Sequence, residues 1–535
     1  MKRLTFIACF AALLAIQSAL IFFFISAVLP EGGVPLDDAW IHFVFARNLA
    51  ERCKLSFNSE QWSGGTSSLL WDLLLAVGYR LSGNMLFTAY GLGVVFYFVS
   101  TLCLLLLLNK AFASVSGGQI AALLSTIAFA STSYIPYLAL SGMDAIMFLA
   151  LSLASLVAFV YGKDSLAGWL LAALILTRLE GLGLVCAICI ARYAQDLFTQ
   201  HCNKLNRLLK ITLPASSTLF FYFFFNWLTV GYPLPTTIAG RKWLWGLPEG
   251  LWAFDPQRAW RFFRDWKLLL TDFIILGERP GILVLFGASA AVGLIGLLVE
   301  IIRQPSRFLG IIILAMWVFL HNLAYLFLAP LASLRHQSPN LILLPVLAVN
   351  GWVFLARYLR PRFCRLVIIL GGLVIILCLL PKTVIYREVF AWNVAHINRV
   401  HVAAGKWVFT HLPEDAVLAA FDIGAVKYFG NRQTLDLGGL LDINFVHRYL
   451  YPAKVTEYLY ENGASYLVMP EPIRGQPDLK TRLGFYSEEQ VKKAYLHPLV
   501  TFEAEPYIRP PFNSLQYQFY PAYLRITIYE IHWIQ

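Results

Sequence analysis

Apolar runs about as long as a bilayer is thick recur along most of this chain, and they restrict its fold more than any other feature. About 20 apolar residues in a helix cross the hydrocarbon layer of a membrane. Hydrophobic residues make up 59% of the chain and charged residues 14%, whereas soluble domains carry about 25% charged residues. The runs predict a polytopic α-helical membrane protein with spans at 4–29, 85–109, 117–138, 143–161, 211–230, 281–302, 308–329, 338–356 and 365–381.

Positive charge predicts the orientation of these spans, because cytoplasmic loops are enriched in Lys and Arg. The first run, 4–29, follows Lys2 and Arg3 and is longer than the apolar part of a signal peptide. We interpret it as a retained span that begins in the cytoplasm. The net charge of +11 fits this pattern at an anionic membrane surface, and no nucleic-acid-binding motif is visible. The segments expected on the cytoplasmic side contain Lys110, Lys163, residues 192–210, Arg303 with Arg307, and residues 357–365.

Residues 165–191 must then begin and end on the cytoplasmic side, and the polar stretch 177–181 interrupts them. We expect a hairpin of two helices of about 13 residues each, or ~20 Å, which is shorter than the ~30 Å hydrocarbon layer. Arg178 and Glu180 should therefore lie in the membrane or near its outer boundary. This scheme predicts eleven spans, and the segments that it places on the extracytoplasmic side are 30–84, 231–280, 330–337 and all residues from 382 onward.

The C-terminal region has a different character and predicts a soluble α/β domain. We expect a membrane domain over 1–381, with the outer loop 30–84, and an extracytoplasmic domain over 382–535. No cysteine follows Cys378, so the second domain has neither a disulfide framework nor a thiolate metal site. The expected strands are 417–421, 465–469 and 523–531, and the expected helices are 397–411 and 486–495.

Two adjacent carboxylates, Asp37 and Asp38, stand at the start of the first outer loop, in the sequence P-L-D-D-A-W-I-H over residues 35–42. Carboxylates close to lipid are costly unless they take part in function or bind a cation. Asp is also a favoured N-cap residue, so the pair could simply cap the helix that follows. Spacing alone leaves both interpretations open.

The order of several motifs resembles that of the GT-C superfamily of membrane glycosyltransferases. The nearest group is the bacterial arabinofuranosyltransferases that use decaprenyl-phosphate arabinose. The first loop carries D-D-A-W-I-H-x-x-x-A-R-N-L-A from Asp37 and G-T-S-S-L-L-W from Gly65. The similar segments that follow are S-G-M-D at 141–144, L-T-R-L-E-G at 176–181, Y-P-L-P-T-T at 232–237 with Lys242, L-R-H at 334–336 with Pro345, G-K-W at 405–407, D-I-G-A at 422–425 and L-D-L-G-G-L at 435–440. Departures at Asp144, Leu179, Thr236 and His336 leave the donor sugar and the acceptor open.

The resemblance implies that a first-loop Asp is the general base for an acceptor hydroxyl, whose pKa lies far above neutral pH. We expect Asp37 to be the base with Asp38 as its helper, or the reverse. Because the leaving group is a phosphate, positive charge must stabilise the developing anion. The candidates for donor phosphate binding are Arg178, Lys242, Arg335 and His336, and those for acceptor contact or support are His42, Asp144, Glu180 and Thr237. No cofactor is required by the sequence, and the candidate ligands of a divalent cation (Mg, Mn or Ca) are Asp37, Asp38 and Asp144.

These residues also have structural interpretations. Arg178 and Glu180 could pair with each other, Asp144 could cap an outer turn, and His42 could lie on a solvated helix face. Lys242 could anchor the chain at the membrane interface together with Arg241, Trp243 and Trp245. Asp422 and Asp436 follow or end predicted strands, where capping a turn or contacting the membrane domain is a simpler role than binding a glycan.

We therefore expect a plasma-membrane enzyme that transfers a hexosyl or pentosyl residue from a polyprenyl-phosphate carrier to a glycan or lipid of the cell envelope. Its expected partners are this donor, the acceptor and membrane lipids, and transfer should occur on the extracytoplasmic face. The resemblance also implies inversion at the anomeric carbon. The alternatives are a lipid-linked-sugar transporter or flippase, which an inverted repeat would favour, and a non-catalytic subunit of envelope assembly. We see no inverted repeat in the sequence.

Overall fold

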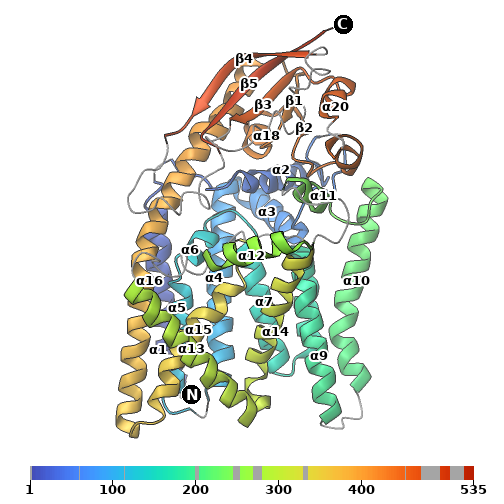
Figure 1. The fold of residues 1–535 in the computed structure, drawn as a ribbon. Helices are drawn as coiled ribbons and strands as arrows, with labels where there is room; N and C mark the ends of the chain where they lie inside the picture. Colours follow the sequence, from blue (N-terminus) through green and yellow to red (C-terminus); the bar gives the residue numbers. More distant parts are fainter. Residues whose placement is uncertain are drawn as a thin grey trace.

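The computed structural model describes residues 3–29, 31–59, 61–113, 115–198, 204–244, 254–268, 280–328, 335–451, 454–471, 494–505 and 523–534. Its lower part in Figure 1 is a bundle of helices, and its upper part is a sheet with helices around it. The N-terminus lies at the lower end of the bundle, and the C-terminus lies at the opposite end, beyond the sheet. The predicted fold class, a helical membrane part with a C-terminal α/β part, is confirmed.

The predicted spans coincide with helices of the bundle. Six helices of the described ranges are long and apolar enough to cross a membrane: α1 (Arg3–Ile25), α4 (Met85–Ala111), α10 (Lys204–Val230), α13 (Pro280–Arg303), α14 (Pro305–Leu328) and α16 (Pro361–Ile397). Shorter apolar helices lie among them: α5 (Gly118–Ala130), α7 (Ala145–Val160), α8 (Asp164–Thr177), α9 (Leu182–Phe198) and α15 (Asn340–Ala356). The chain is thus a multi-pass membrane protein. The count of eleven spans stays a prediction, because the shorter helices fall below the length of about 20 residues that a span requires.

The hairpin predicted over 165–191 is present. Helix α8 ends at Thr177, a single 3₁₀ turn follows over Leu179–Gly181 (η1), and α9 begins at Leu182. The polar stretch thus forms the turn between two short helices, as expected. Arg178 consequently lies beside His336, in the chain before α15.

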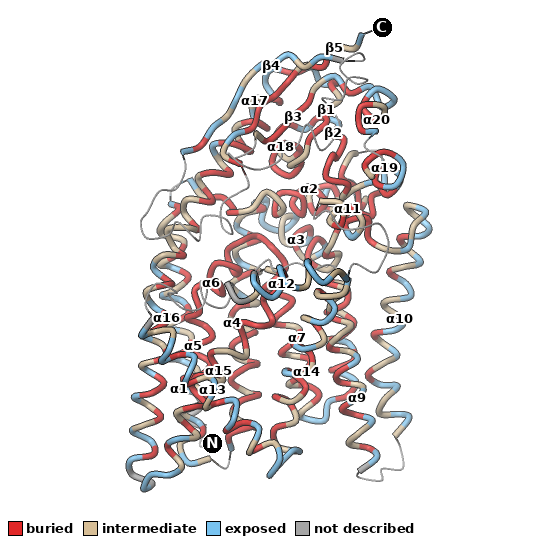
Figure 2. The backbone as a smooth tube through the Cα atoms, viewed as in Figure 1, coloured by how far each residue is buried: buried red, intermediate tan, exposed pale blue. Residues whose placement is uncertain are grey.

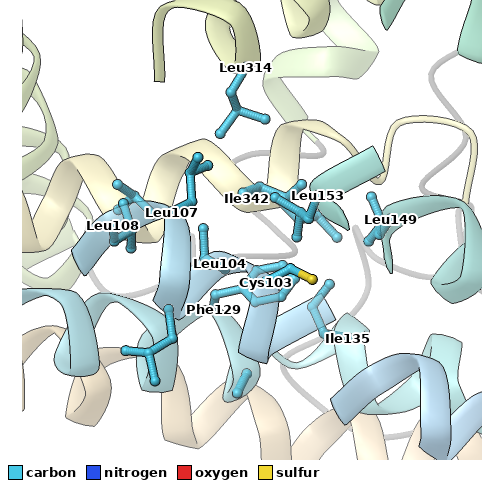
Figure 3. Close-up of a cluster of buried hydrophobic side chains, with 14 of the residues drawn as sticks. Cys103, Leu104, Leu107, Leu108, Phe129, Ile135, Leu149, Leu153, Leu314 and Ile342 are labelled. Carbon is cyan, nitrogen blue, oxygen red and sulfur yellow. The ribbon is translucent and has the colours of Figure 1, made fainter. Parts of the chain in front are cut away.

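Aliphatic side chains from helices far apart in the sequence fill the centre of the bundle. Leu104 of α4, Leu149 of α7 and Leu314 of α14 belong to one buried cluster (Figure 3). Buried residues gather inside the bundle and in the layer under the sheet (Figure 2). Large apolar side chains such as Phe220 and Phe221 of α10 are exposed, as expected for a surface that contacts lipid.

Close helix packing in the bundle depends on glycine. A Cβ atom on Gly293 of α13 would lie 1.9 Å from the carbonyl oxygen of Leu347, and one on Gly351 of α15 would lie 2.1 Å from that of Ser289. The backbones therefore approach as closely as small residues allow, which is a common way to pack helices in membranes. Asn350 joins the two helices further, because its Nδ2 donates to the carbonyl of Gly293 (2.7 Å).

A layer of short helices lies between the bundle and the sheet. Helices α2 (Asp37–Arg52) and α3 (Leu69–Ser82) come from the first outer loop, and α11 (Thr237–Leu244) comes from the segment after α10 (Figure 1). Two further helices, α6 (Tyr134–Ala139) and α12 (Pro256–Leu268), lie near the same end of the bundle. The described parts of the predicted outer segments 30–84 and 231–280 therefore lie at one end of the molecule, next to the C-terminal part.

The sheet has the strand order β2-β1-β3-β5-β4. Strands β2, β1 and β3 are parallel, and β5 pairs antiparallel with both β3 and β4. Its elements are β1 (Val417–Ala420), β2 (Gln433–Asp436), β3 (Tyr466–Glu471), β4 (Ala494–Glu503), β5 (Arg525–Trp533), α17 (Ala403–His411), α18 (Gly424–Gly430), α19 (Ile443–Phe445) and α20 (Val455–Glu461).

The three predicted strands are confirmed by β1, β3 and β5, and the helix predicted over 397–411 is confirmed by the end of α16, a π-helical turn (η3, Asn398–Val402) and α17. The helix predicted over 486–495 lies outside the described residues up to 493. It is wrong at Ala494 and Tyr495, which begin β4 because they pair with the end of β5. Helix α16 continues past residue 381 to Ile397, so one continuous helix joins the two parts of the chain.

We expect Gly293→Ala to lower the midpoint of thermal unfolding of the detergent-purified protein by several degrees. The added methyl group would overlap the α15 backbone, and overpacking of this kind costs about 1–3 kcal/mol. Gly287→Ala in the same helix is the control, because a Cβ there meets nothing within 4 Å. Equal midpoints for the two variants would contradict the close approach of α13 and α15.

Candidate active site

A pocket lies where the first outer loop, α11, the chain before α15 and the sheet domain meet. It has a volume of about 110 Å³. We name it the Asp38 pocket, and its polar lining residues are Asp37, Asp38, His42, Thr66, Ser67, Thr237, Arg241, Arg335, His336 and Asp422. Most of the residues that sequence reasoning selected are therefore together, although they are spread over almost 400 positions of the chain.

Asp37, the first residue of α2, holds the sheet domain. Its two carboxylate oxygens accept the backbone N–H groups of Gly424 and Ala425, each at 2.8 Å, where α18 begins. A Cβ atom at Gly424 would lie 2.2 Å from the backbone oxygen of Asp37, so glycine is needed for this approach. Burial raises the pKa of Asp37 to about 6, with His401 lowering it and Asp422 raising it. Asp37 is thus a domain contact as well as a lining residue.

Asp38, the next residue, forms an ion pair with Arg335. Its Oδ2 lies 2.5 Å from Arg335 Nη2, and 38% of the Asp38 side chain is exposed to the pocket. Burial alone would raise the pKa of Asp38, but the positive charges of Arg335 and Arg241 outweigh it and lower the pKa. Both carboxylates line the pocket, and Asp38 is the one whose pKa neighbouring positive charge lowers.

Asp144 and Arg178 form a second, fully buried pair. Arg178 Nε and Nη2 donate to the two oxygens of Asp144 at 2.8 and 2.7 Å, which is the bidentate geometry of a strong pair. The proposed pairing of Arg178 with Glu180 is absent among the described contacts. Glu180 instead accepts the hydroxyl of Tyr325 of α14 at 2.7 Å, while Arg178 is engaged by Asp144. Asp144 precedes α7 without capping it through its side chain.

His336 lies between two guanidinium groups. Its Nδ1 is 3.4 Å from Arg178 Nη1, and its Nε2 is 3.4 Å from Arg335 Nε. Burial, followed by the charges of Arg335, Arg241 and Arg178, lowers the pKa of His336 well below its usual value. A neutral imidazole next to three arginines indicates a strongly positive region under the pocket.

His42 belongs to a buried network of hydrogen-bonded side chains. Sequence reasoning selected only His42 from this network. Its Nδ1 lies 2.6 Å from Asp72 Oδ1, and the Thr66 hydroxyl donates to Asp72 Oδ2 at 2.5 Å. Burial alone would lower the pKa of His42, but Asp72 outweighs it and raises the pKa. His42 is 3% exposed, so the interpretation as a solvated helix-face residue is wrong. Asp72 was not selected, although a carboxylate inside the apolar run 69–75 is the signal that would have found it.

Helix α11 places Arg241, rather than Lys242, in the pocket lining. Successive residues of a helix point about 100° apart, so Arg241 can line the pocket while its neighbour Lys242 does not. Thr237 and Arg241 are four positions apart and share one face, which is the signal that would have found Arg241. Lys242 is 5% exposed and lies outside the lining. Trp245, part of the proposed interfacial anchor, lies outside the described residues.

The sheet domain contributes two carboxylates with different roles. Asp436 accepts the backbone N–H groups of Gly438 (2.8 Å), Leu440 and Leu441 (2.9 Å), so it caps the turn after β2 as one of our interpretations held. Asp422 lines the pocket and contacts His401 Nε2 at 3.1 Å. Sequence reasoning did not select His401, which lies in η3 and has no motif around it.

The three carboxylates proposed as metal ligands do not form a shared site. Asp37 is bound by backbone N–H groups, Asp38 by Arg335, and Asp144 by Arg178. Among the residues that the structure describes, no group of three or more His, Cys, Asp or Glu side chains is arranged to hold a metal ion. Metal dependence therefore stays a prediction that this arrangement does not favour.

Two solved membrane proteins have folds that are similar to that of this chain over most of its length. Similarity extends over 97% of this chain and 97% of ArnT from Cupriavidus metallidurans bound to undecaprenyl phosphate, with a TM-score of 0.54 and 12% identity. The archaeal oligosaccharyltransferase AglB from Archaeoglobus fulgidus, solved with an inhibitory peptide and a dolichol-phosphate, has a TM-score of 0.54 and 11% identity, covering 90% of this chain and 72% of AglB. This chain has a GT-C-like fold.

The sequence comparisons add one match. Residues 392–520 match the family model "Domain of unknown function (DUF8728)", which includes most of the sheet domain. No curated protein matches the sequence. The narrower resemblance to arabinofuranosyltransferases stays a prediction.

We expect the contribution of Asp37 to stability to fall as pH rises from about 4 to about 7, and Asp37→Asn to remove this contribution from the pH profile. A carboxyl group whose pKa is raised on folding, here from 3.8 to about 6, contributes stability at low pH that is lost as pH rises through the folded pKa. Denaturant unfolding of both variants across this range measures the difference. The raised pKa of Asp436 is common to both and cancels. Parallel pH profiles would contradict the assignment.

Proposed function

We propose that this protein is a membrane glycosyltransferase that moves a sugar from a polyprenyl-phosphate carrier to a hydroxyl group of an envelope glycan or lipid. The observation that carries the proposal is the Asp38–Arg335 ion pair, which brings a carboxylate and a phosphate-binding cation together in one pocket at the membrane end of the sheet domain. The fold is shared with proteins solved with undecaprenyl phosphate and with dolichol-phosphate. We further propose that this end of the molecule is extracytoplasmic.

The donor phosphate would bind Arg335 and Arg241. Guanidinium groups suit phosphate because they donate two parallel hydrogen bonds. Arg178 already forms a bidentate ion pair with Asp144. Its role would be to add positive potential to the Asp38 pocket without contacting the phosphate directly. His336 lines the same pocket beside Arg335 and would contact the phosphate once this ligand engages Arg335.

Asp38 is the better candidate for the general base, with Asp37 as the residue that positions it. Both oxygens of Asp37 accept backbone N–H groups at the N-terminus of α18, whereas Asp38 pairs with Arg335 and lines the pocket. When a donor phosphate takes Arg335, Asp38 loses its counter-ion and its proton affinity rises. Donor binding would thereby activate the base.

The proposed step is a single displacement. The acceptor hydroxyl oxygen attacks the anomeric carbon, and the bond from that carbon to the phosphate oxygen breaks. The electron pair of that bond leaves with the polyprenyl phosphate, and Asp38 takes the hydroxyl proton. This mechanism inverts the anomeric centre and needs a base but no strong acid, because the leaving group is a phosphate.

We expect Asp38→Asn to lower transfer from a radiolabelled polyprenyl-phosphate sugar by roughly 10²–10⁴-fold, the usual contribution of a general base. Asp37→Asn should lower transfer less, because it removes a charge without removing the base. Thermal unfolding and size exclusion check that both variants fold. Turnover by Asp38→Asn at the wild-type rate would end the assignment. Movement of the donor across the membrane without transfer would instead favour the flippase alternative.

We expect Arg241→Ala to weaken donor binding by roughly 10–100-fold, since a hydrogen bond to a charged group contributes about 1.5–3 kcal/mol. Lys242→Met is the matched control on the next residue, and it should change the KM for the donor little because Lys242 lies outside the pocket lining. Donor titration of both purified variants measures the difference. The reverse order would show that α11 is rotated relative to this description.

A further inference from the structure

A second pocket lies beside the Asp38 pocket and takes no part in the function proposed so far. Its volume is about 290 Å³, close to the lower limit of roughly 300 Å³ that is typical of small-molecule sites. It lies between the first outer loop and the sheet domain, at the C-terminal end of β2. We name it the Trp62 pocket. The lining residues that matter here are Gln61, Trp62, Gln433, Asp442, Tyr458 and Asn462.

We propose that the Trp62 pocket binds the acceptor, and that the acceptor is an uncharged glycan of two or more sugar units. The proposal rests on the glycosyl transfer proposed above and names its acceptor class. Four features of the structure support it: an exposed indole, planar polar side chains around it, the absence of cations from the lining, and a shared wall with the Asp38 pocket.

The indole of Trp62 offers an aromatic surface. The Trp62 side chain is 42% exposed, and Phe225 holds it edge-on at 5.8 Å between ring centroids. An exposed aromatic ring that is fixed in this way suits the apolar C–H face of a sugar ring. Tyr458 adds a second aromatic side chain, which is itself fixed by packing on Phe445 at 4.4 Å.

Planar polar groups surround this ring. Gln61, Gln433, Asp442 and Asn462 are exposed and line the pocket. Amides both donate and accept hydrogen bonds and carboxylates accept them, which matches the neighbouring hydroxyl groups of a sugar. Asp442 also caps α19 through Oδ1, and Asn462 Nδ2 donates to the carbonyl of Tyr458. Asn58 has a structural role, because its side chain bonds the backbone of Thr434 and the ammonium of Lys427.

The charge of the two pockets differs. The Asp38 pocket contains Arg241 and Arg335. Among the described residues that line the Trp62 pocket there is no Lys or Arg, and two carboxylates, Asp436 and Asp442, are present. The Lys54 ammonium lies 6.0 Å from the centroid of the Trp62 ring and Lys427 donates to Asn58, so these two carboxylates are offset and the described part of the lining presents no strong positive charge to a ligand. The pocket therefore fits an uncharged glycan better than a phospholipid head group.

A thin wall separates the two pockets. Thr236 and Leu441 line the Trp62 pocket. Their neighbours Thr237 and Leu440 line the Asp38 pocket. The hydroxyl of Thr236 donates to the carbonyl of Leu440, and a Cβ atom on Gly65 would lie 2.7 Å from that carbonyl. A sugar in the Trp62 pocket is thus on the other side of one layer of backbone from Asp38. The reacting end of the acceptor must extend around this wall to reach Asp38, so the acceptor must contain more than one sugar unit.

The test combines an acceptor assay with direct binding. Trp62→Ala should raise the KM for an uncharged oligosaccharide acceptor roughly tenfold, about 1.4 kcal/mol, while hydrolysis of the donor in the absence of acceptor stays at the wild-type rate. Trp62→Phe should restore most of the affinity. Trp260→Ala is the control, because Trp260 of α12 is 72% exposed and lies outside both pockets.

Binding is measured with the full chain in nanodiscs on an array of immobilised uncharged and acidic glycans. We expect retention by uncharged glycans that Trp62→Ala removes and Trp260→Ala leaves unchanged. Retention only by acidic glycans, retention that is insensitive to Trp62→Ala, or no retention by any glycan would each overturn the proposal. Loss of donor hydrolysis in the wild type would instead count against the glycosyltransferase function itself, so the two failures are distinguishable.

Discussion

The contact between Asp37 and the start of α18 joins the two parts of this molecule, and the arrangement of the site depends on it. One carboxylate accepts two backbone N–H groups of a distant domain, at a glycine that permits the approach. The charge of Asp37 is favoured by these donors and opposed by burial. Because Asp37 is fixed in this way, the next residue, Asp38, is directed into the space between the domains, where it meets Arg335.

Positive charge is concentrated around this space and is only partly neutralised. Arg178 is paired with Asp144, and Arg335 with Asp38, while Arg241 lines the same pocket. Charges in a partly buried site interact strongly, since the local dielectric constant is far below that of water. A site of this kind favours a ligand with negative charge that can replace Asp38 on Arg335. The proposed donor phosphate has this property, and its binding would release the carboxylate that the reaction needs.

Two features of the fold support this arrangement from both sides. The bundle is held by close helix packing at positions such as Gly293 and Gly351, and α16 continues from the bundle into the sheet domain. The two pockets lie on opposite faces of a wall formed by the first loop and the turn after β2. Their different charges would allow one side to hold an anionic donor and the other an uncharged acceptor.

The sequence by itself determined the features that depend on local periodicity. Apolar length gave the helices of the bundle, the interruption at Arg178 gave the hairpin, and alternation gave β5, because each of these is a property of consecutive residues. The order of the motifs in the sequence also selected the segments that line the Asp38 pocket in the structure. Only the tertiary structure decided how neighbouring residues divide their contacts: Asp37 accepts from α18 while Asp38 pairs with Arg335, and Arg241 lines the pocket while Lys242 does not. Adjacent helical side chains differ by about 100° in direction, and the partner that selects one of them lies hundreds of residues away.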